Sequence, residues 1–248
     1  MKDIVYIVGE GSPWNDNELR YSLRSLAKNM TWYQNIYVIG KIPNFLSDKV
    51  IKVPAVDVGN NKEERIKNKI LIACYHPNIT DDFLLMNDDY FFQAPTRADF
   101  PFYYQKELKD FFKRDGHYRS ALENTVKALA ARDLSACKYF DVHTPIEYNK
   151  RRFIDTMEAY DWSINEGYLI RSLYCNTQRI EGVPYIDCKV GLDCSYELLL
   201  QLVEGKPMFS IDDAAINDAL FGYLDNMFPE PTEYETGTDR PQSLNSMM

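Results

Sequence analysis

A short apolar run, residues 83–86, constrains the fold more than any other stretch of this chain. Consecutive large apolar residues bounded by acids are typical of a strand buried on both faces of a parallel sheet. Asn87, Asp88 and Asp89 follow the run directly, and the chain then turns apolar again. Because ligands of open α/β sheets bind outside the carboxyl ends of the strands, these three polar residues are predicted to lie at a binding site.

The adjacent acids Asp88 and Asp89 have the chemistry of a metal site. Carboxylates are hard oxygen ligands, suited to Mg²⁺ or Mn²⁺ that carries a phosphate. Burying them without a cation costs roughly several kcal/mol each. The alternative is that both acids only cap a turn, because Asp is a common turn residue. The triplet alone does not decide between the two, and the apolar runs on either side favour a site.

Strands and helices alternate along the first part of the chain, which predicts an α/β fold with a mostly parallel sheet flanked by helices. We expect one domain over residues 1–231, with a helical and aromatic insertion near 96–136. Residues 232–248 are polar and are predicted to form a loose tail. The predicted strands before the central run are residues 4–8, 35–40 and 50–53, and the predicted helices begin near Asn15 or Asp16 and span 60–75.

Charge and cysteine content exclude several classes of protein. The formal net charge of −9 argues against a nucleic-acid binder, although a small anion needs only a local cluster of cations. The five cysteines are odd in number and lack Cys-x-x-Cys spacing, which argues against a disulfide framework or a structural zinc site.

The sequence starts directly with a strand and has no apolar run of about 20 residues to span a membrane. We expect a cytoplasmic protein, with a peripheral position at the inner membrane face left open.

Glycines and cations follow the first predicted strand. Gly9 and Gly11 form a loop where the backbone could approach a ligand closely. Arg20 and Arg24 lie four residues apart on the next helix, whose first turn points at the predicted crevice. Like charges at this spacing usually form a solvated face, and the functional alternative is an anion bound between them. Lys69 has the same two interpretations, a solvated face or a contact with the crevice.

His143 lies at the polar tip of a predicted strand, residues 139–145, ahead of a helix. A lone histidine is more often a structural residue than a catalyst, so its role as a general base stays open at this point. Lys150, Arg151 and Arg152 begin the helix that follows. Cations are unfavourable at that end of a helix dipole, which indicates an anion nearby.

Taken together, these residues resemble the conserved blocks of the Stealth family. Stealth proteins are sugar-1-phosphate transferases of bacterial capsule synthesis and include the lysosomal-enzyme N-acetylglucosamine-1-phosphotransferase. The resemblance covers most of residues 3–176 and looks like a compact branch, such as those encoded near bacterial surface-glycan genes or in phages. The second block is matched by residues 17–26, 36–39 and 83–92, a shortened first block by 5–12, the third by His143-Thr144-Pro145 with Lys150, and the fourth by Arg171 followed by Asn176.

This resemblance implies a glycosyltransferase-A-like, Rossmann-like fold that uses a nucleotide sugar, with a UDP-sugar favoured, and a glycan or polysaccharide acceptor. It assigns Asp88 and Asp89 to Mg²⁺ or Mn²⁺. It assigns His143, Asp89 and Arg171 to catalysis, with His143 as the general base that deprotonates the acceptor hydroxyl. The residues expected to bind the nucleotide sugar are Gly9, Gly11, Asn17, Arg20, Arg24, Lys69, Asn87, Lys150 and Asn176.

Three functions remain open from the sequence. The first is transfer of a sugar-1-phosphate to a hydroxyl, and the second is ordinary glycosyl transfer, in which the sugar leaves without its phosphate. One fold hosts both chemistries. The third is a non-catalytic binder of a nucleotide sugar or glycan. The aromatic share of 14% would suit a glycan surface, although core packing is the commoner reason for such a share.

Overall fold

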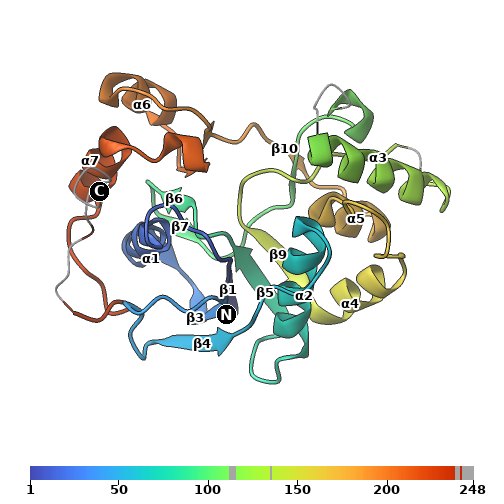
Figure 1. The fold of residues 1–248 in the computed structure, drawn as a ribbon, viewed down its shortest axis with the longest axis horizontal. Helices are drawn as coiled ribbons and strands as arrows, with labels where there is room; N and C mark the ends of the chain where they lie inside the picture. Colours follow the sequence, from blue (N-terminus) through green and yellow to red (C-terminus); the bar gives the residue numbers. More distant parts are fainter. Residues whose placement is uncertain (112–115, 135, 238–240, 242–248) are drawn as a thin grey trace.

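A five-stranded sheet lies at the centre of the computed structural model, which describes residues 1–111, 116–134, 136–237 and 241. Its order is β4-β3-β1-β5-β9; the first four strands are parallel and β9 is antiparallel to β5 (Figure 1). The predicted mostly parallel α/β sheet is therefore confirmed. In chain order the elements are β1 (Lys2–Val8), α1 (Asn17–Asn29), β2 (Met30–Thr31), β3 (Tyr33–Gly40), β4 (Val50–Pro54), α2 (Lys62–Tyr75), β5 (Asp82–Met86), β6 (Tyr90–Phe92), β7 (Thr96–Arg97), β8 (Tyr103–Tyr104), the 3₁₀ helix η1 (Leu108–Phe111), α3 (Gly116–Ala130), β9 (Ile146–Asn149), α4 (Lys150–Glu158), α5 (Ile170–Thr177), β10 (Val183–Pro184), β11 (Lys189–Val190), α6 (Tyr196–Val203), β12 (Met208–Ile211), the 3₁₀ helix η2 (Asp213–Ala215) and α7 (Asp218–Met227).

Strands β1 and β5 are buried because both of their faces are apolar. Val5, Phe83 and Leu85 pack against α2, α4 and α5, whereas Ile4 and Leu84 pack on the opposite face with α1. Figure 1 shows these two helical layers on either side of the sheet. Since side chains alternate between the faces of a strand, a shift of β5 by one residue would exchange its two packed sets. The end of β5 is therefore fixed in position.

A second, three-stranded sheet begins directly after the turn that ends β5. Strand β6 pairs antiparallel with β12, which pairs with β11, and α6 and α7 pack beside this sheet. Helix α1 is anchored to β6: Ser22 Oγ donates to the Tyr90 carbonyl oxygen at 2.7 Å, and the Phe92 N–H donates to Ser25 Oγ at 3.1 Å. The turn over residues 87–89 thus lies between two anchored strands.

The predicted strand over residues 139–145 is wrong, because β9 starts only at Ile146. The backbone of Tyr139 pairs with Gln105 and Lys106, and the Phe140 N–H donates to Ser172 Oγ at 2.9 Å. These groups therefore bond to a loop and to α5 instead of to a sheet. The apolar pattern of this stretch comes from loop side chains that are buried in the core.

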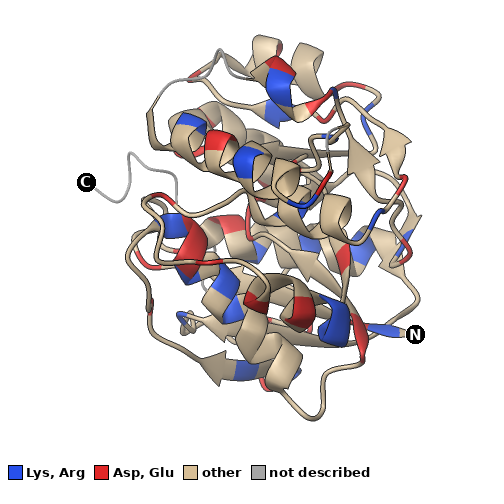
Figure 2. Cartoon of the chain, turned by 90° about the vertical axis from the view of Figure 1, so that its right-hand side faces the viewer, with Lys and Arg blue, Asp and Glu red and all other residues tan. Residues whose placement is uncertain are grey.

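The predicted insertion contains β7, β8, η1 and α3, and its residues 112–115 and 135 lie outside the described residues. Helix α3 packs beside α5. Among the described residues, no helix combines the length and the apolar character needed to cross a membrane. On the side of the molecule drawn in Figure 2, basic and acidic residues are interspersed.

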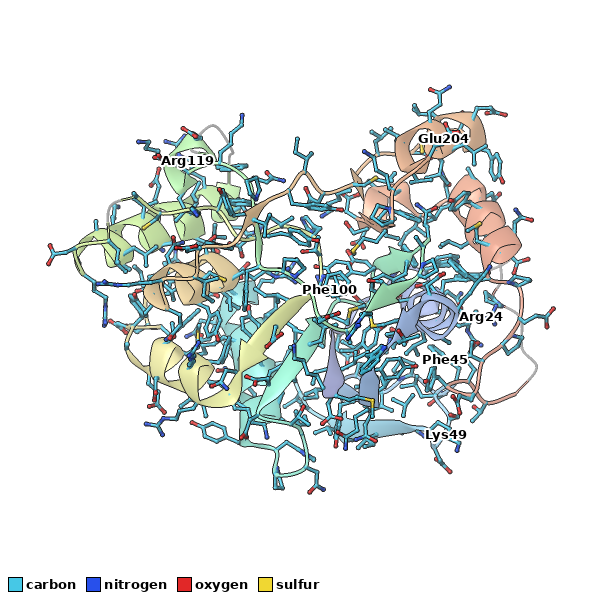
Figure 3. All side chains as sticks on the ribbon, turned by 180° about the vertical axis from the view of Figure 1, so that it is seen from behind. Arg24, Phe45, Lys49, Phe100, Arg119 and Glu204 are labelled. Carbon is cyan, nitrogen blue, oxygen red and sulfur yellow. The ribbon has the colours of Figure 1, made fainter. Side chains whose placement is uncertain are left out.

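The tail predicted to be loose is packed over residues 232–237. Glu235 is buried and accepts from Arg24 Nε at 2.8 Å and from Arg24 Nη2 at 2.9 Å, and Arg20 Nη1 donates to it at 3.0 Å (Figure 3, where Arg24 is labelled). Tyr234 is also buried, and its hydroxyl bonds to that of Tyr33. The prediction failed here because a single paired acid anchors a segment whose composition is otherwise polar. Residues 238–240 and 242–248 lie outside the described residues.

Glu235→Gln is expected to lower the free energy of unfolding by about 3–5 kcal/mol, because it leaves the buried Arg24 guanidinium without its counter-charge. Urea unfolding followed by circular dichroism measures the change. Glu233→Gln is the matched control, since Glu233 is two residues away and exposed. A loss for Glu235→Gln no larger than that of the control would contradict the assigned role.

Candidate functional site

The carboxyl ends of β1, β3 and β5 meet at one edge of the sheet, which we call the carboxyl edge. There the ends of β1 and β3 approach so closely that a Cβ on Gly40 would lie 2.0 Å from the Val8 carbonyl oxygen, and Gly40 has φ +120°. Only glycine fits this position. Lys69, from α2, donates its Nζ to the same Val8 oxygen at 3.0 Å and pairs with Asp57. The buried ammonium group of Lys69 therefore lies at this edge.

Several predicted nucleotide-sugar residues lie at this edge. Gly9 and Gly11 are exposed in the loop after β1, and Gly11 has φ +90°. Asn17 begins α1 at the end of that loop, and Asn87 is half-buried directly after β5. Together with Lys69, these residues surround the place where the resemblance puts the donor.

Asp88 and Asp89 form the turn between β5 and β6 and are half-buried. Burial raises the pKa of Asp89 to about 6, although the positive charges of Lys189 and Arg171 oppose this. Burial, and then the charges of Asp89 and Glu18, raise the pKa of Asp88 well above its usual range. Oδ1 of Asp89 is buried and makes no hydrogen bond to any residue that the structure describes. An unsatisfied buried carboxylate of this kind fits a cation ligand.

Glu18 adds a third acid near this pair, and the sequence reasoning gave it no role. It lies in the first turn of α1, is 7% exposed, and its buried Oε2 has no hydrogen-bond partner within the described ranges. Burial raises its pKa. The neighbouring Asp16 is already neutralised by Lys41, whose Nζ lies 2.8 Å from Asp16 Oδ2. Acids are common in the first turn of a helix, and Glu18 differs from them only in its buried, unpaired Oε2. The burial of that oxygen cannot be read from the sequence.

The donor set fits a divalent cation that also binds substrate. Within the described part of the chain, no three His, Cys, Asp or Glu side chains are grouped to hold a metal by themselves. Mg²⁺ usually keeps several waters and is bound by one or two carboxylates together with substrate phosphates. Asp88 and Asp89 would hold such an ion, which would then also contact the donor phosphates.

His143 lies at the same edge because β9 runs antiparallel to β5. Leu85 faces Ile146 in this pair, so the residues before β9 and those after β5 emerge at one end of the sheet. The backbone is sharply turned at His143, where the Thr144 N–H donates to the Val142 carbonyl oxygen at 2.8 Å. The predicted location is thus reached although the predicted strand is absent.

Arg171 fixes this turn relative to the acids. Its Nη1 donates to the carbonyl oxygens of Val142 at 2.7 Å and Thr144 at 2.5 Å, on either side of His143. Its Nη2 donates to the Tyr90 hydroxyl at 3.0 Å, and Tyr90 directly follows Asp89. In this structure the guanidinium therefore links the turn that carries His143 to the strand that follows the acidic pair.

Three further acids surround this region and were not predicted. Asp187 accepts the His143 N–H at 2.8 Å and is held by Gln105 at 2.7 Å. Asp141 accepts from the Ser172 N–H at 3.1 Å and from its hydroxyl at 2.5 Å. Burial, and then the charge of Asp141, raise the pKa of Glu63 in α2 to about 7. Glu63 and Asp187 lie far from His143 in the sequence, so no local motif reveals them. Asp141 is only two residues before His143.

Lys150 and Asn176 do not lie at this edge, which corrects their predicted roles. Lys150 Nζ donates to the carbonyl oxygens of His76, at 2.7 Å, and Ile79, beside the amino end of β5. The Lys150 ammonium group therefore donates its hydrogen bonds to backbone oxygens of the chain itself. Asn176 accepts the Lys138 N–H at 2.9 Å and donates to the Lys138 and Ser172 oxygens, so its side chain ties α5 to a loop.

Arg20 and Arg24 also lie away from the acids, on the face of α1 that contacts the C-terminal segment. An anion does lie between them, as one interpretation predicted, but it is the carboxylate of Glu235. Arg20 also stacks over Phe45 at 4.2 Å, and Arg24 Nη1 donates to the Phe228 oxygen at 3.0 Å (Figure 3). Residues 18, 22 and 25 take the opposite face, towards the acidic turn and β6.

Comparisons with known proteins agree with this architecture. The galactosyltransferase LgtC, in a crystal structure with donor and acceptor sugar analogs, is 11% identical, with a TM-score of 0.50 over 93% of this chain and 98% of that chain. An active-site mutant of LgtC is also 11% identical, with a TM-score of 0.51 and the same coverage. The glycosyltransferase-A-like fold is therefore confirmed.

Sequence comparisons give two results. A search of curated proteins finds no match. Residues 14–111 match the family model described as Stealth protein CR2, conserved region 2. The predicted resemblance to the Stealth family is thus confirmed over residues 14–111, which contain the predicted second block.

Proposed function

We propose that this protein is a metal-dependent transferase that moves a sugar-1-phosphate from a nucleotide sugar to a hydroxyl of a glycan acceptor. Both comparisons point to the coarser class, nucleotide-sugar transferases. The observation that carries the finer proposal is that His143 and the pair Asp88 and Asp89 leave the sheet at one edge, where Arg171 bonds to the turn of His143 and to Tyr90, the residue after Asp89. The resemblance adds a UDP-sugar donor and a glycan or polysaccharide acceptor of bacterial capsule synthesis.

The reaction forms one bond and breaks one bond at phosphorus. The acceptor oxygen attacks the phosphorus that carries the sugar, and the bridging oxygen leaves with the nucleoside monophosphate. His143 takes the proton of the acceptor hydroxyl, and Arg171 holds the turn that carries His143 in place. The bound cation would offset the negative charge of the phosphoryl oxygens and the leaving group. Lys69 and the loop of Gly9 and Gly11 would hold the donor beside it.

Ordinary glycosyl transfer is the second candidate, because the similar solved structures are of a galactosyltransferase. It would use the same acids and cation. The released nucleotide separates the two reactions, since glycosyl transfer releases a nucleoside diphosphate. A non-catalytic glycan binder would release neither.

Asp89→Asn is expected to lower nucleotide release by about 100-fold or more, because the charge stabilisation supplied by a metal ion is worth several kcal/mol. The assay combines the protein with Mn²⁺ or Mg²⁺, a panel of UDP-sugars and bacterial polysaccharide acceptors, and identifies the nucleotide by chromatography. Monophosphate is the expected product. Diphosphate would replace this proposal by glycosyl transfer, and the exposed Asp48→Asn should behave as wild type.

His143→Gln is expected to lower turnover by about 10²–10⁴-fold, the usual contribution of a general base, with little change in donor affinity. Turnover at saturating donor and Mn²⁺-dependent donor binding by calorimetry are measured on the same variant. A loss of binding as large as the loss of turnover would show that His143 holds the donor and would contradict the assignment as base.

Asp89→Asn is also expected to stabilise the protein at pH 7 when no cation is present. The raised pKa, from the usual 3.8 to about 6, means that the folded state disfavours the ionised carboxylate. This penalty is complete above about pH 6 and absent below about pH 4, so the variant should gain about 1–3 kcal/mol at pH 7 and nothing near pH 3.5. Urea unfolding at both pH values measures the gain. Destabilisation at pH 7 would contradict the burial penalty.

A further inference from the structure

A pocket of about 360 Å³ lies at the opposite end of the sheet from the acids. Its lining comes from the start of β1, the turn between β2 and β3, the start of β5, and β7. The residues that the following argument uses are Trp32, Arg97, Asp81 and Asp82. None of them belongs to the site at the carboxyl edge, and neither the family model nor the fold assigns this pocket a ligand.

Trp32 is unusual in both exposure and backbone. It is 61% exposed, whereas Trp14 and Trp162 are 0% and 8% exposed. Its φ is +71°, in the left-handed region that bulky residues rarely adopt. That conformation costs about 1–2 kcal/mol for a residue with a Cβ. Gly or Asn would make the same turn more easily, and the exposed indole adds little to the core, so packing does not explain a tryptophan at this position.

Arg97 stacks on the indole and favours one orientation of it. Its guanidinium carbon lies 4.3 Å from the ring centroid, and its Nε lies 3.5 Å from Asp99 Oδ1. The parallel pairing of β7 with β2 brings Arg97 beside the turn that carries Trp32. A ring that is oriented before a ligand arrives loses less conformational entropy on binding.

Hydrogen-bond acceptors lie beside this ring. Asp81 is exposed, and its carboxylate has no partner among the residues of the described ranges. Asp82 uses Oδ1 to accept from Asn149 at 2.8 Å. Ionised carboxylates only accept hydrogen bonds, so a ligand here has to donate them. The cations Lys2 and Arg97 line the same pocket and are paired with Glu147 and Asp99.

We propose that this pocket binds a glycan chain, with one sugar ring against the Trp32 indole and its hydroxyls donating to Asp81 and Asp82. A sugar presents apolar C–H groups on a ring face and hydroxyl donors at its rim, which matches an aromatic surface bordered by acceptors. Strand β1 has seven residues, so roughly 23 Å separates the two edges of the sheet. Only a polymer is long enough to occupy this pocket and the carboxyl edge at the same time. That this polymer is the glycan acceptor rests on the proposed function.

Fluorescence quenching tests the binding without donor or cation, because Trp32 is the exposed one of the three tryptophans. Maltohexaose, cellohexaose and chitohexaose are each added up to about 10 mM, and quenching by acrylamide is measured. At least one hexaose is expected to protect Trp32 with a Kd of about 1 mM or tighter. No protection by any of the three overturns the proposal.

Variants separate a binding role from a structural one. Trp32→Asn keeps a residue that tolerates the left-handed backbone, so its melting temperature should be unchanged or higher, while calorimetry should show hexaose affinity at least tenfold weaker. Asp81→Asn should also weaken binding, and Tyr75→Ala, at another exposed aromatic residue, should not. Wild-type affinity in Trp32→Asn overturns the site. If hexaoses bind but no nucleotide is released in any assay, the glycan site stands and the proposed transferase function fails.

Discussion

Two carboxylates that share one half-buried turn set the conditions for the rest of the carboxyl edge. Burial raises the pKa of Asp88 and of Asp89, Oδ1 of Asp89 makes no hydrogen bond to any described residue, and Glu18 adds a third charge. The turn keeps this unfavourable arrangement because strand β5 before it and strand β6 after it are both anchored, β6 through serines of α1. Folding therefore holds the acids close together before any cation arrives, and a cation that binds relieves their repulsion.

Arg171 makes the geometry of this edge depend on one side chain. It bonds to the turn around His143 and to the hydroxyl of Tyr90, so the proposed base and the acidic turn are positioned by the same planar group. Lysine cannot replace that fork of donors, because an ammonium group has no fixed planar geometry. The resemblance places Arg171 in catalysis, and its contacts here are those of a residue that positions others.

The sequence predicted those features of the fold that a local pattern of residues determines. The run at 83–86 indicated a buried strand, and the acids after it indicated the edge at which we place the proposed site, since both follow from burial and strand direction alone. Arg20, Arg24 and Lys150 were misplaced because helical spacing does not reveal which partner faces a charge. Their partners are Glu235 and backbone oxygens far away in the chain. His143 was predicted to lie at the end of a strand that does not exist, and the antiparallel β9 brings it to the same edge as the acids instead.

The fold alone does not decide which bond of the donor breaks, since one architecture serves both transfers. The decisive quantity is the distance between base and cation. Attack on phosphorus requires the base to lie beside the phosphate that the cation holds, whereas attack on the sugar carbon places the acceptor oxygen farther away, across the anomeric carbon. Leu85 faces Ile146 in the last pair of β5 with β9, so the turn that carries His143 and the turn that carries Asp88 leave the sheet at the same end. Arg171 bonds both to the turn of His143 and to Tyr90, the residue after Asp89. These contacts favour a base close to the proposed cation, and therefore the proposed attack on phosphorus.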